Sequence, residues 1–237
     1  MTETRATMRG IPGDAARKRG LRRIFIPVLL FGVLFGFAAG VLLGNMDILP
    51  WWIGLILFLA AFACLFLFRL HHANLVYGYF KGARGEEMVA GELVRLPATW
   101  TVFNGLILPD GSDVDHVAVG PQGIFVIETK HWRGDVSIDN GQLLANGRPL
   151  IKSPILQVRT LISALNDYLE TATDDVHGVL CFAGPQFLST PQQIDEVKIC
   201  SHLNLSEMLT SGPTLFDATE VAGYVARLGS LTITQGL

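Results

Sequence analysis

Two long apolar runs fill most of the first third of the chain. Residues 24–43 and residues 51–68 contain no charged side chain, and each run is about as long as a helix that crosses a bilayer core. The connection at residues 44–50 has no Lys or Arg, whereas basic residues flank both outer ends of the pair: Arg17, Lys18, Arg19, Arg22, Arg23, Arg69, Lys81 and Arg84. The positive-inside rule then places both ends in the cytoplasm. We therefore expect an integral protein of the inner or plasma membrane, with two transmembrane helices within residues 24–70 and the lipid bilayer as a partner.

The segment before the first run, residues 1–23, is polar, basic and glycine-containing, and we expect a disordered cytoplasmic tail there. Within the first run, Gly32, Gly36 and Gly40 recur every four residues. Such a stripe of small residues permits close contact between membrane helices. Glycine is also simply common in membrane helices, and both interpretations stay open.

From residue 73 to residue 237 the pattern becomes that of a folded domain. An amphipathic helix is expected over Leu75–Leu96, closed by Pro97. The elements expected after it are a strand at Thr99–Leu108, two strands joined by a tight turn within Asp113–Lys130, a hairpin at Gly134–Pro149, a helix that begins at Ser153-Pro154, strands at Val176–Phe182 and Val197–Cys200, and helices at Leu205–Thr210 and Asp217–Leu228. This order predicts an α/β sandwich with a mixed sheet.

The two expected strands within residues 113–130 carry the candidate chemistry. A continuous apolar run over residues 124–127 is typical of a strand buried on both faces, and it ends at Glu128 and Lys130. These two residues leave the same strand face, and Asp115 on the neighbouring strand can bring a second carboxylate to them. Two carboxylates and a lysine suit Mg²⁺-assisted phosphodiester hydrolysis. The alternatives are a surface ion pair for Glu128 and Lys130 and a turn role for Asp115.

Charge and cysteine content change this picture in two ways. Residues 1–72 hold eight Lys and Arg against three Asp and Glu, whereas residues 73–237 hold ten against eighteen. An acidic domain is not typical of a protein that binds DNA avidly and without specificity. The three cysteines show no paired or metal-type spacing, which fits a reducing compartment.

An ordered set of short motifs resembles a known family. The motifs are Gly82-x-x-Gly85-Glu86 at a helix, Asp113-x-Asp115-His116-Val117 on one strand, Gly123 to Lys130 on the next, and Pro154-Ile155-x-Gln157 at a helix start. Together, over about Lys81–Gly184, they resemble the NERD (nuclease-related) domain, a family similar to the PD-(D/E)xK restriction-endonuclease-like superfamily. The resemblance implies a restriction-endonuclease-like α/β/α sandwich and a metal-dependent nuclease.

The resemblance also implies roles for individual residues. Asp115 and Glu128 match the two acidic metal-binding positions, and the Thr129 carbonyl matches a further ligand of Mg²⁺ or Mn²⁺. Lys130 matches the lysine that orients water and steadies developing negative charge. Glu86 and Gln157 match polar helix positions that face the same site. Helix-dipole complementation is the alternative for Glu86, and helix capping or solvent exposure is the alternative for Gln157.

The leading interpretation is a membrane-anchored nuclease that cleaves phosphodiester bonds of nucleic acid, with DNA favoured over RNA. The alternative is a non-catalytic, membrane-tethered binding or scaffold module with the nuclease fold. Trp132, beside Arg133, could stack on a base or cover the edge of the core. The second Glu-x-Lys triplet, Glu196-Val197-Lys198, follows no buried run and reads as a solvated strand edge.

Overall fold

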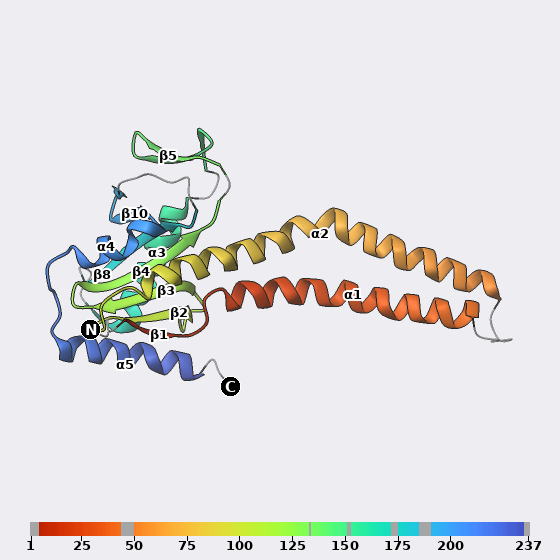
Figure 1. Cartoon of the computed structure of the whole chain (residues 1–237), viewed down its shortest axis with the longest axis horizontal. Coiled ribbons are helices and arrows are strands. Elements are labelled where there is room, and N and C mark those ends of the chain that lie inside the picture. The colour runs from red at the N-terminus through yellow and green to blue at the C-terminus, as the bar shows by residue number, and fades with distance from the viewer. Residues whose placement is uncertain are drawn as a thin grey trace. The chain divides into compact units, whose positions relative to one another are not determined.

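The structure is a computed structural model of the whole chain. It describes residues 5–43, 50–132, 134–150, 153–171, 175–184 and 191–234 (Figure 1). The chain divides into two compact units. One comprises Ala15–Lys81, and the other joins the N-terminal residues through Asp14 with Gly82–Leu237. Residues 44–49 of the connection expected at residues 44–50 lie outside the described residues, as does Arg133.

The first unit is formed by two long helices, α1 (Asp14–Leu43) and most of α2 (Trp51–Leu93). Asp14–Leu43 and Trp51–Leu70 are each long and apolar enough to cross a membrane. The two helices meet through aromatic side chains, with Phe31 and Phe62 edge to face at 5.8 Å between ring centroids. Gly32, Gly36 and Gly40 each have open space where a Cβ would stand, within the described part of the chain. The glycine stripe therefore does not mediate the contact between α1 and α2.

The helix expected over Leu75–Leu96 is confirmed as far as Leu93, but it is not a separate element, because α2 continues without a break from Trp51 to Leu93. The polar residues after Phe68 end the apolar run but leave the backbone hydrogen bonds of a helix intact. Apolarity and helicity are different properties, and the sequence shows only where the first one ends. The helix does end shortly before Pro97, as expected.

The second unit is built on a seven-stranded mixed sheet in the order β1-β2-β3-β4-β8-β10-β9. The strands are β1 (Thr7–Arg9), β2 (Thr101–Ile107), β3 (Asp113–Gly120), β4 (Gly123–Lys130), β8 (Val176–Phe182), β9 (Gln192–Ile194) and β10 (Val197–Ser201). β3 is antiparallel to both of its neighbours, β2 and β4, and β8 is parallel to both β4 and β10. The predicted mixed α/β class is confirmed.

The predicted hairpin at residues 134–149 is a three-stranded sheet of β5 (Val136–Asp139), β6 (Gln142–Ala145) and β7 (Arg148–Pro149). Each of its two turns is an Asn-Gly pair with positive φ at both positions, at residues 140–141 and 146–147. These are the conformations that tight turns between antiparallel strands require. Two such turns therefore give three strands.

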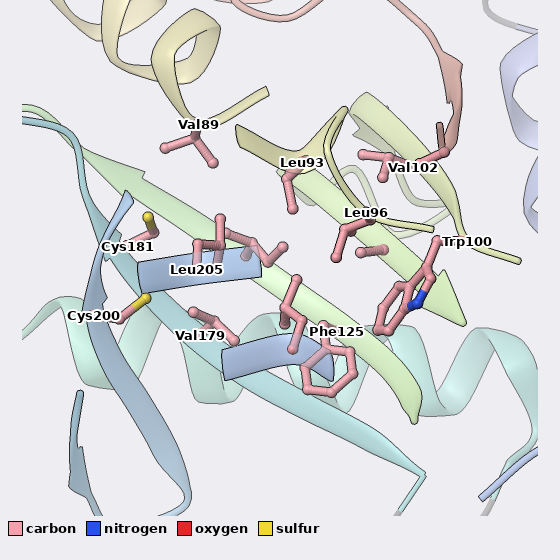
Figure 2. Close-up of a cluster of buried hydrophobic side chains, with 14 of the residues drawn as sticks. Val89, Leu93, Leu96, Trp100, Val102, Phe125, Val179, Cys181, Cys200 and Leu205 are labelled. Atoms are coloured by element: carbon pink, nitrogen blue, oxygen red, sulfur yellow. The ribbon is translucent and has the colours of Figure 1, made fainter. Parts of the chain in front are cut away.

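Helices cover both faces of the main sheet. On one face, Val89 and Leu93 of α2 and Leu205 of α4 (Leu205–Thr210) pack with Phe125 of β4 (Figure 2). On the other face, α3 (Pro154–Leu169) and α5 (Ala218–Thr234) pack against the alternate residues of the same strands, including Ile124 and Val126. Because side chains alternate along β4, Glu128 and Lys130 belong to the α3 face.

The expectation of a disordered tail is wrong for the described residues before the first apolar run. Thr7, Met8 and Arg9 pair in parallel with Thr101, Val102 and Phe103 and form an edge of the sheet, and α1 begins at Asp14. The N–H of Ala6 donates to the carbonyl of Leu96 at 2.9 Å. An edge strand offers unpaired backbone groups to any segment that reaches it, whatever its side-chain pattern. The polar composition therefore gave no signal for β1.

Candidate active site

The candidate site lies where β3 and β4 separate. Backbone pairing of the two strands is recorded as far as His116 opposite Ile127, so the next opposed pair in this register is Asp115 and Glu128. At this pair a side chain of β3 contacts the backbone of β4: Asp115 Oδ2 accepts the backbone N–H of Thr129 at 2.8 Å. Opposed residues of antiparallel strands share a sheet face. The fork therefore brings the two carboxylates to one point, at the end of a buried strand.

Glu128, Lys130 and Gln157 form a closed network of three side chains. The ammonium of Lys130 lies 2.6 Å from Glu128 Oε1, and the amide Nε2 of Gln157 donates to the same oxygen at 2.7 Å. Lys130 also donates to Gln157 Oε1 at 3.0 Å. Glu128 is only 4% exposed, whereas Lys130 keeps part of its side chain open to solvent. Each member of the network is thus held by the other two.

The helix α3 carries Gln157 to this place. Ser153 caps the helix, and its hydroxyl oxygen accepts the N–H of Leu156 at 3.4 Å, while Pro154 occupies the first turn. The predicted helix start is therefore confirmed. Val158 and Leu161 are buried beneath the helix and fix its rotation. With those positions buried, Gln157 in the first turn faces the end of β4.

The two acids of the cluster are held where their negative charge is unfavourable, so that the pKa of each is raised. Burial raises the pKa of Asp115 well above its ordinary value, and the neighbouring charges of Glu128 and Glu86 raise it further. Burial also raises the pKa of Glu128, although Lys130 and Gln157 oppose the shift. Both acids would therefore gain from a cation that joins Lys130 at this point.

Glu86 approaches the cluster from α2 and has a partner from the N-terminal segment. Its Oε2 accepts the backbone N–H of Gly13 at 2.9 Å. The helix passes close to the end of β4 at Gly85, where a Cβ would stand 2.7 Å from the Cβ of His131. Sequence reasoning missed the Gly13 contact. Glycine is itself a signal for a close approach, but nothing in the local pattern identifies the partner.

The donor atoms suit a hard divalent cation. Mg²⁺ prefers oxygen ligands, keeps several waters and often needs only one or two carboxylates, and Asp115 and Glu128 supply two. The described residues contain no group of three or more His, Cys, Asp or Glu that could hold a metal ion, so the remaining ligands would be water and backbone. The role of the Thr129 carbonyl stays a prediction. The hydroxyl of Thr129 is buried and has no hydrogen-bond partner in the described structure.

Three further residues of the motifs or of the candidate chemistry, His116, Trp132 and Glu196, make no hydrogen bond to this network in the described part of the chain. His116 is fully buried, bonds through Nδ1 to Asn104 Oδ1 at 2.8 Å, and has its pKa lowered by burial to about 3. It is thus a neutral core residue. Trp132 packs edge to face on Phe182, with 5.3 Å between ring centroids, and is half-buried. Glu196 is exposed in a turn, as expected of the second Glu-x-Lys triplet.

Comparison with known protein families agrees with the motif set. The fold and the site define an α/β domain in which two acids, a lysine and a glutamine meet at the end of a buried strand. Residues 81–183 match the family model of NERD, the nuclease-related domain, and this part of the chain is a domain of that family. No curated protein and no solved structure matches the chain.

Proposed function

We propose that the protein is a membrane-anchored, metal-dependent nuclease that hydrolyses phosphodiester bonds of nucleic acid, with DNA favoured over RNA. The observation that carries the proposal is the meeting of Asp115, Glu128 and Lys130 at the fork of β3 and β4, with the pKa of both acids raised. Like charges held together in a buried position are costly and are characteristic of functional sites. The proposal includes a restriction-endonuclease-like arrangement of the sheet and its helices.

Each residue has a role in this proposal. Asp115 and Glu128, with the Thr129 carbonyl, would hold Mg²⁺ or Mn²⁺, which when bound polarises the phosphate and activates water. Lys130 places its ammonium beside the same carboxylates, where it can orient water and stabilise negative charge that develops on the phosphate. Gln157 fixes the positions of Glu128 and Lys130 by bonding to both. Glu86 adds negative charge near Asp115 and can reach a bound cation through water.

The membrane anchor in this proposal is the helical hairpin, with both outer ends in the cytoplasm. Large apolar side chains such as Phe25, Leu29 and Phe66 are exposed along the two helices, as a lipid-facing surface requires. A second argument comes from the sheet. The strand β1 precedes α1 and the strand β2 follows the apolar part of α2, yet they pair with each other. This pairing supports a chain that returns to the side from which it entered the membrane.

One observation favours the non-catalytic alternative. Lys130 lies 2.6 Å from Glu128 and already neutralises one of the two acids, and the domain is acidic as a whole. A scaffold that kept the fold could use these contacts as a structural ion pair. The two candidates differ in whether the cluster binds a divalent cation and turns over a substrate.

The experiment uses the full chain in detergent or nanodiscs, with labelled DNA and RNA and with Mg²⁺ or Mn²⁺. We expect cleavage that chelator abolishes, and turnover lower by roughly 10²-fold or more in Lys130→Ala, with metal binding by calorimetry nearly unchanged. Glu128→Gln should lose metal binding and cleavage together. Glu196→Gln is the matched control, because it changes the acid of the second Glu-x-Lys triplet, which is exposed. If the wild-type protein neither binds the metal nor cuts either substrate, the nuclease proposal is refuted and the scaffold interpretation replaces it.

A further inference from the structure

We propose that the cavity beside the cluster binds the base of an unpaired nucleotide next to the phosphate that is cut. The inference rests on the proposed function and names its substrate class: single-stranded nucleic acid, or duplex ends that have opened. The key contact is between the base and the ring of Trp132. The cavity, the position of that ring and the charge of the domain each support it.

The cavity has a volume of about 680 Å³ and lies at the start of α3. That volume falls within the range of about 300–1,000 Å³ typical of small-molecule sites. Trp132, Pro154 and Leu156 supply apolar surface, and Leu156 is largely exposed although it is a large apolar side chain. An aromatic ring with apolar neighbours offers a platform on which a flat base can stack.

The cavity is continuous with the candidate active site, because Lys130 and Gln157 line both. A phosphate placed at the Lys130 ammonium would therefore have its adjoining nucleoside at the mouth of the cavity. A base that is stacked and paired in a duplex cannot present its face to a side chain, whereas an unpaired base can. The geometry thus selects unpaired nucleotides.

Polar groups at the cavity can also contact the edge of a base. Ser153 accepts the N–H of Leu156, which leaves its own hydroxyl proton available as a donor. Thr160 donates its hydroxyl proton to the carbonyl of Leu156 at 3.0 Å, which leaves oxygen lone pairs available as acceptors. The cavity therefore presents both a donor and an acceptor, as recognition of a base edge requires.

The ring of Trp132 is held before any ligand arrives. It packs edge to face on Phe182 and lies against the core cluster that includes Val136 and Leu180. A side chain that is already ordered loses little conformational entropy when a base stacks on it. The contact can therefore contribute most of its stacking energy to binding.

The acidic charge of the domain supports the same conclusion. With ten Lys and Arg against eighteen Asp and Glu in residues 73–237, phosphate contacts alone cannot supply most of the affinity for a polyanion. Stacking does not depend on the sign of the protein's charge. Binding should then show a shallow salt dependence, because few counterions are released.

The test measures binding of the full chain to a labelled single-stranded oligonucleotide by fluorescence anisotropy, in chelator so that no cleavage occurs. A fully abasic oligonucleotide of the same length keeps the phosphates and lacks the bases. We expect the wild type to bind the abasic strand roughly tenfold or more weakly than the normal strand. Trp132→Ala should bind both strands equally weakly, and Trp132→Phe should keep most of the difference.

The matched control is Leu203→Ala, because Leu203 is also an exposed apolar side chain, at 66% exposure, and does not line the cavity. A wild type that binds both strands equally, or a Trp132→Ala variant that still prefers the normal strand, would overturn the inference. Cleavage with Mg²⁺ separates this inference from the proposed function. Base-dependent binding without any cleavage would contradict only the nuclease proposal, whereas cleavage with the same KM in Trp132→Ala would contradict only the base site.

Discussion

Replacing Asp115 by asparagine removes one charge from the acidic cluster while keeping the side-chain volume and a hydrogen-bond acceptor. Burial, Glu128 and Glu86 all raise the pKa of Asp115, which means that the folded protein disfavours the charged form of this side chain. The asparagine oxygen can still accept the N–H of Thr129, at a loss of about 1 kcal/mol because the acceptor is no longer charged. We expect relief of the charge cost to exceed this loss, so that the metal-free variant gains on the order of 1 kcal/mol of stability.

The stability gained by Asp115→Asn should depend on pH. A carboxyl group whose pKa is raised by folding binds its proton more tightly in the folded state, so its contribution to stability is greatest in acid. That contribution is lost as the pH rises from the ordinary range of aspartate, about 3.9, through the folded-state pKa. The gain of Asp115→Asn over wild type should therefore be small at acid pH and largest at neutral pH.

The assay is urea unfolding followed by pulse proteolysis of the full chain, at several pH values, in chelator and in Mg²⁺. Metal that binds only the folded state stabilises it by about 2.7 kcal/mol at one hundred times its Kd. We expect the wild type to gain stability in Mg²⁺ and Asp115→Asn to gain nothing, because a neutral amide is a poor ligand for a hard dication. Cleavage should be lost together with the metal response. Asp139→Asn, which removes an exposed charge of the same domain, is the matched control and should behave as wild type.

One pattern of results would refute this reasoning. If Asp115→Asn were less stable than wild type without metal at neutral pH, the carboxylate would be a structural anchor for Thr129 rather than a strained ligand. If in addition Mg²⁺ did not stabilise the wild type, the cluster would be an ion-pair network and the scaffold interpretation would replace the nuclease proposal.

Three further predictions follow from other parts of the structure. Deleting residues 1–12 should destabilise the domain by about 2–4 kcal/mol in the same urea assay, because it removes β1, several backbone hydrogen bonds and the partner of the buried Asn104 amide; unchanged stability would contradict the β1 pairing. Epitope tags at the two ends of the chain should both be cleaved, or both protected, when protease is added to sealed membrane vesicles, and opposite behaviour would contradict the hairpin topology. His116 has its pKa lowered to about 3, so its contribution to stability is present above about pH 6.5 and is lost as the pH falls toward 3; His116→Gln should flatten unfolding free energy over this range, and an unchanged slope would contradict the assignment.

Local patterns in the sequence determined much of the domain. The alternation of side chains along a strand was enough to place Glu128 and Lys130 on one face at the end of a buried run, and the structure has them there. The Ser153-Pro154 pair was enough to start α3, because a capping hydroxyl and a residue without N–H satisfy the first turn. These features depend on neighbours within a few residues, and the sequence contains all of that information.

Tertiary structure alone decided which distant groups complete the site. The Gln157 amide reaches Glu128 across 29 residues of chain, and the Gly13 N–H reaches Glu86 across 73. The strand β1 joins the sheet through backbone groups that every residue has, and α2 continues where the apolar run stops. Periodicity reports which face of an element is buried but not which element covers it. For this protein the sequence therefore determined which acids and which lysine form the candidate site. The fold determined the contact of Asp115 with Thr129 and the contact of the N-terminal segment with Glu86. Those contacts exist only once the sheet and its helices have packed.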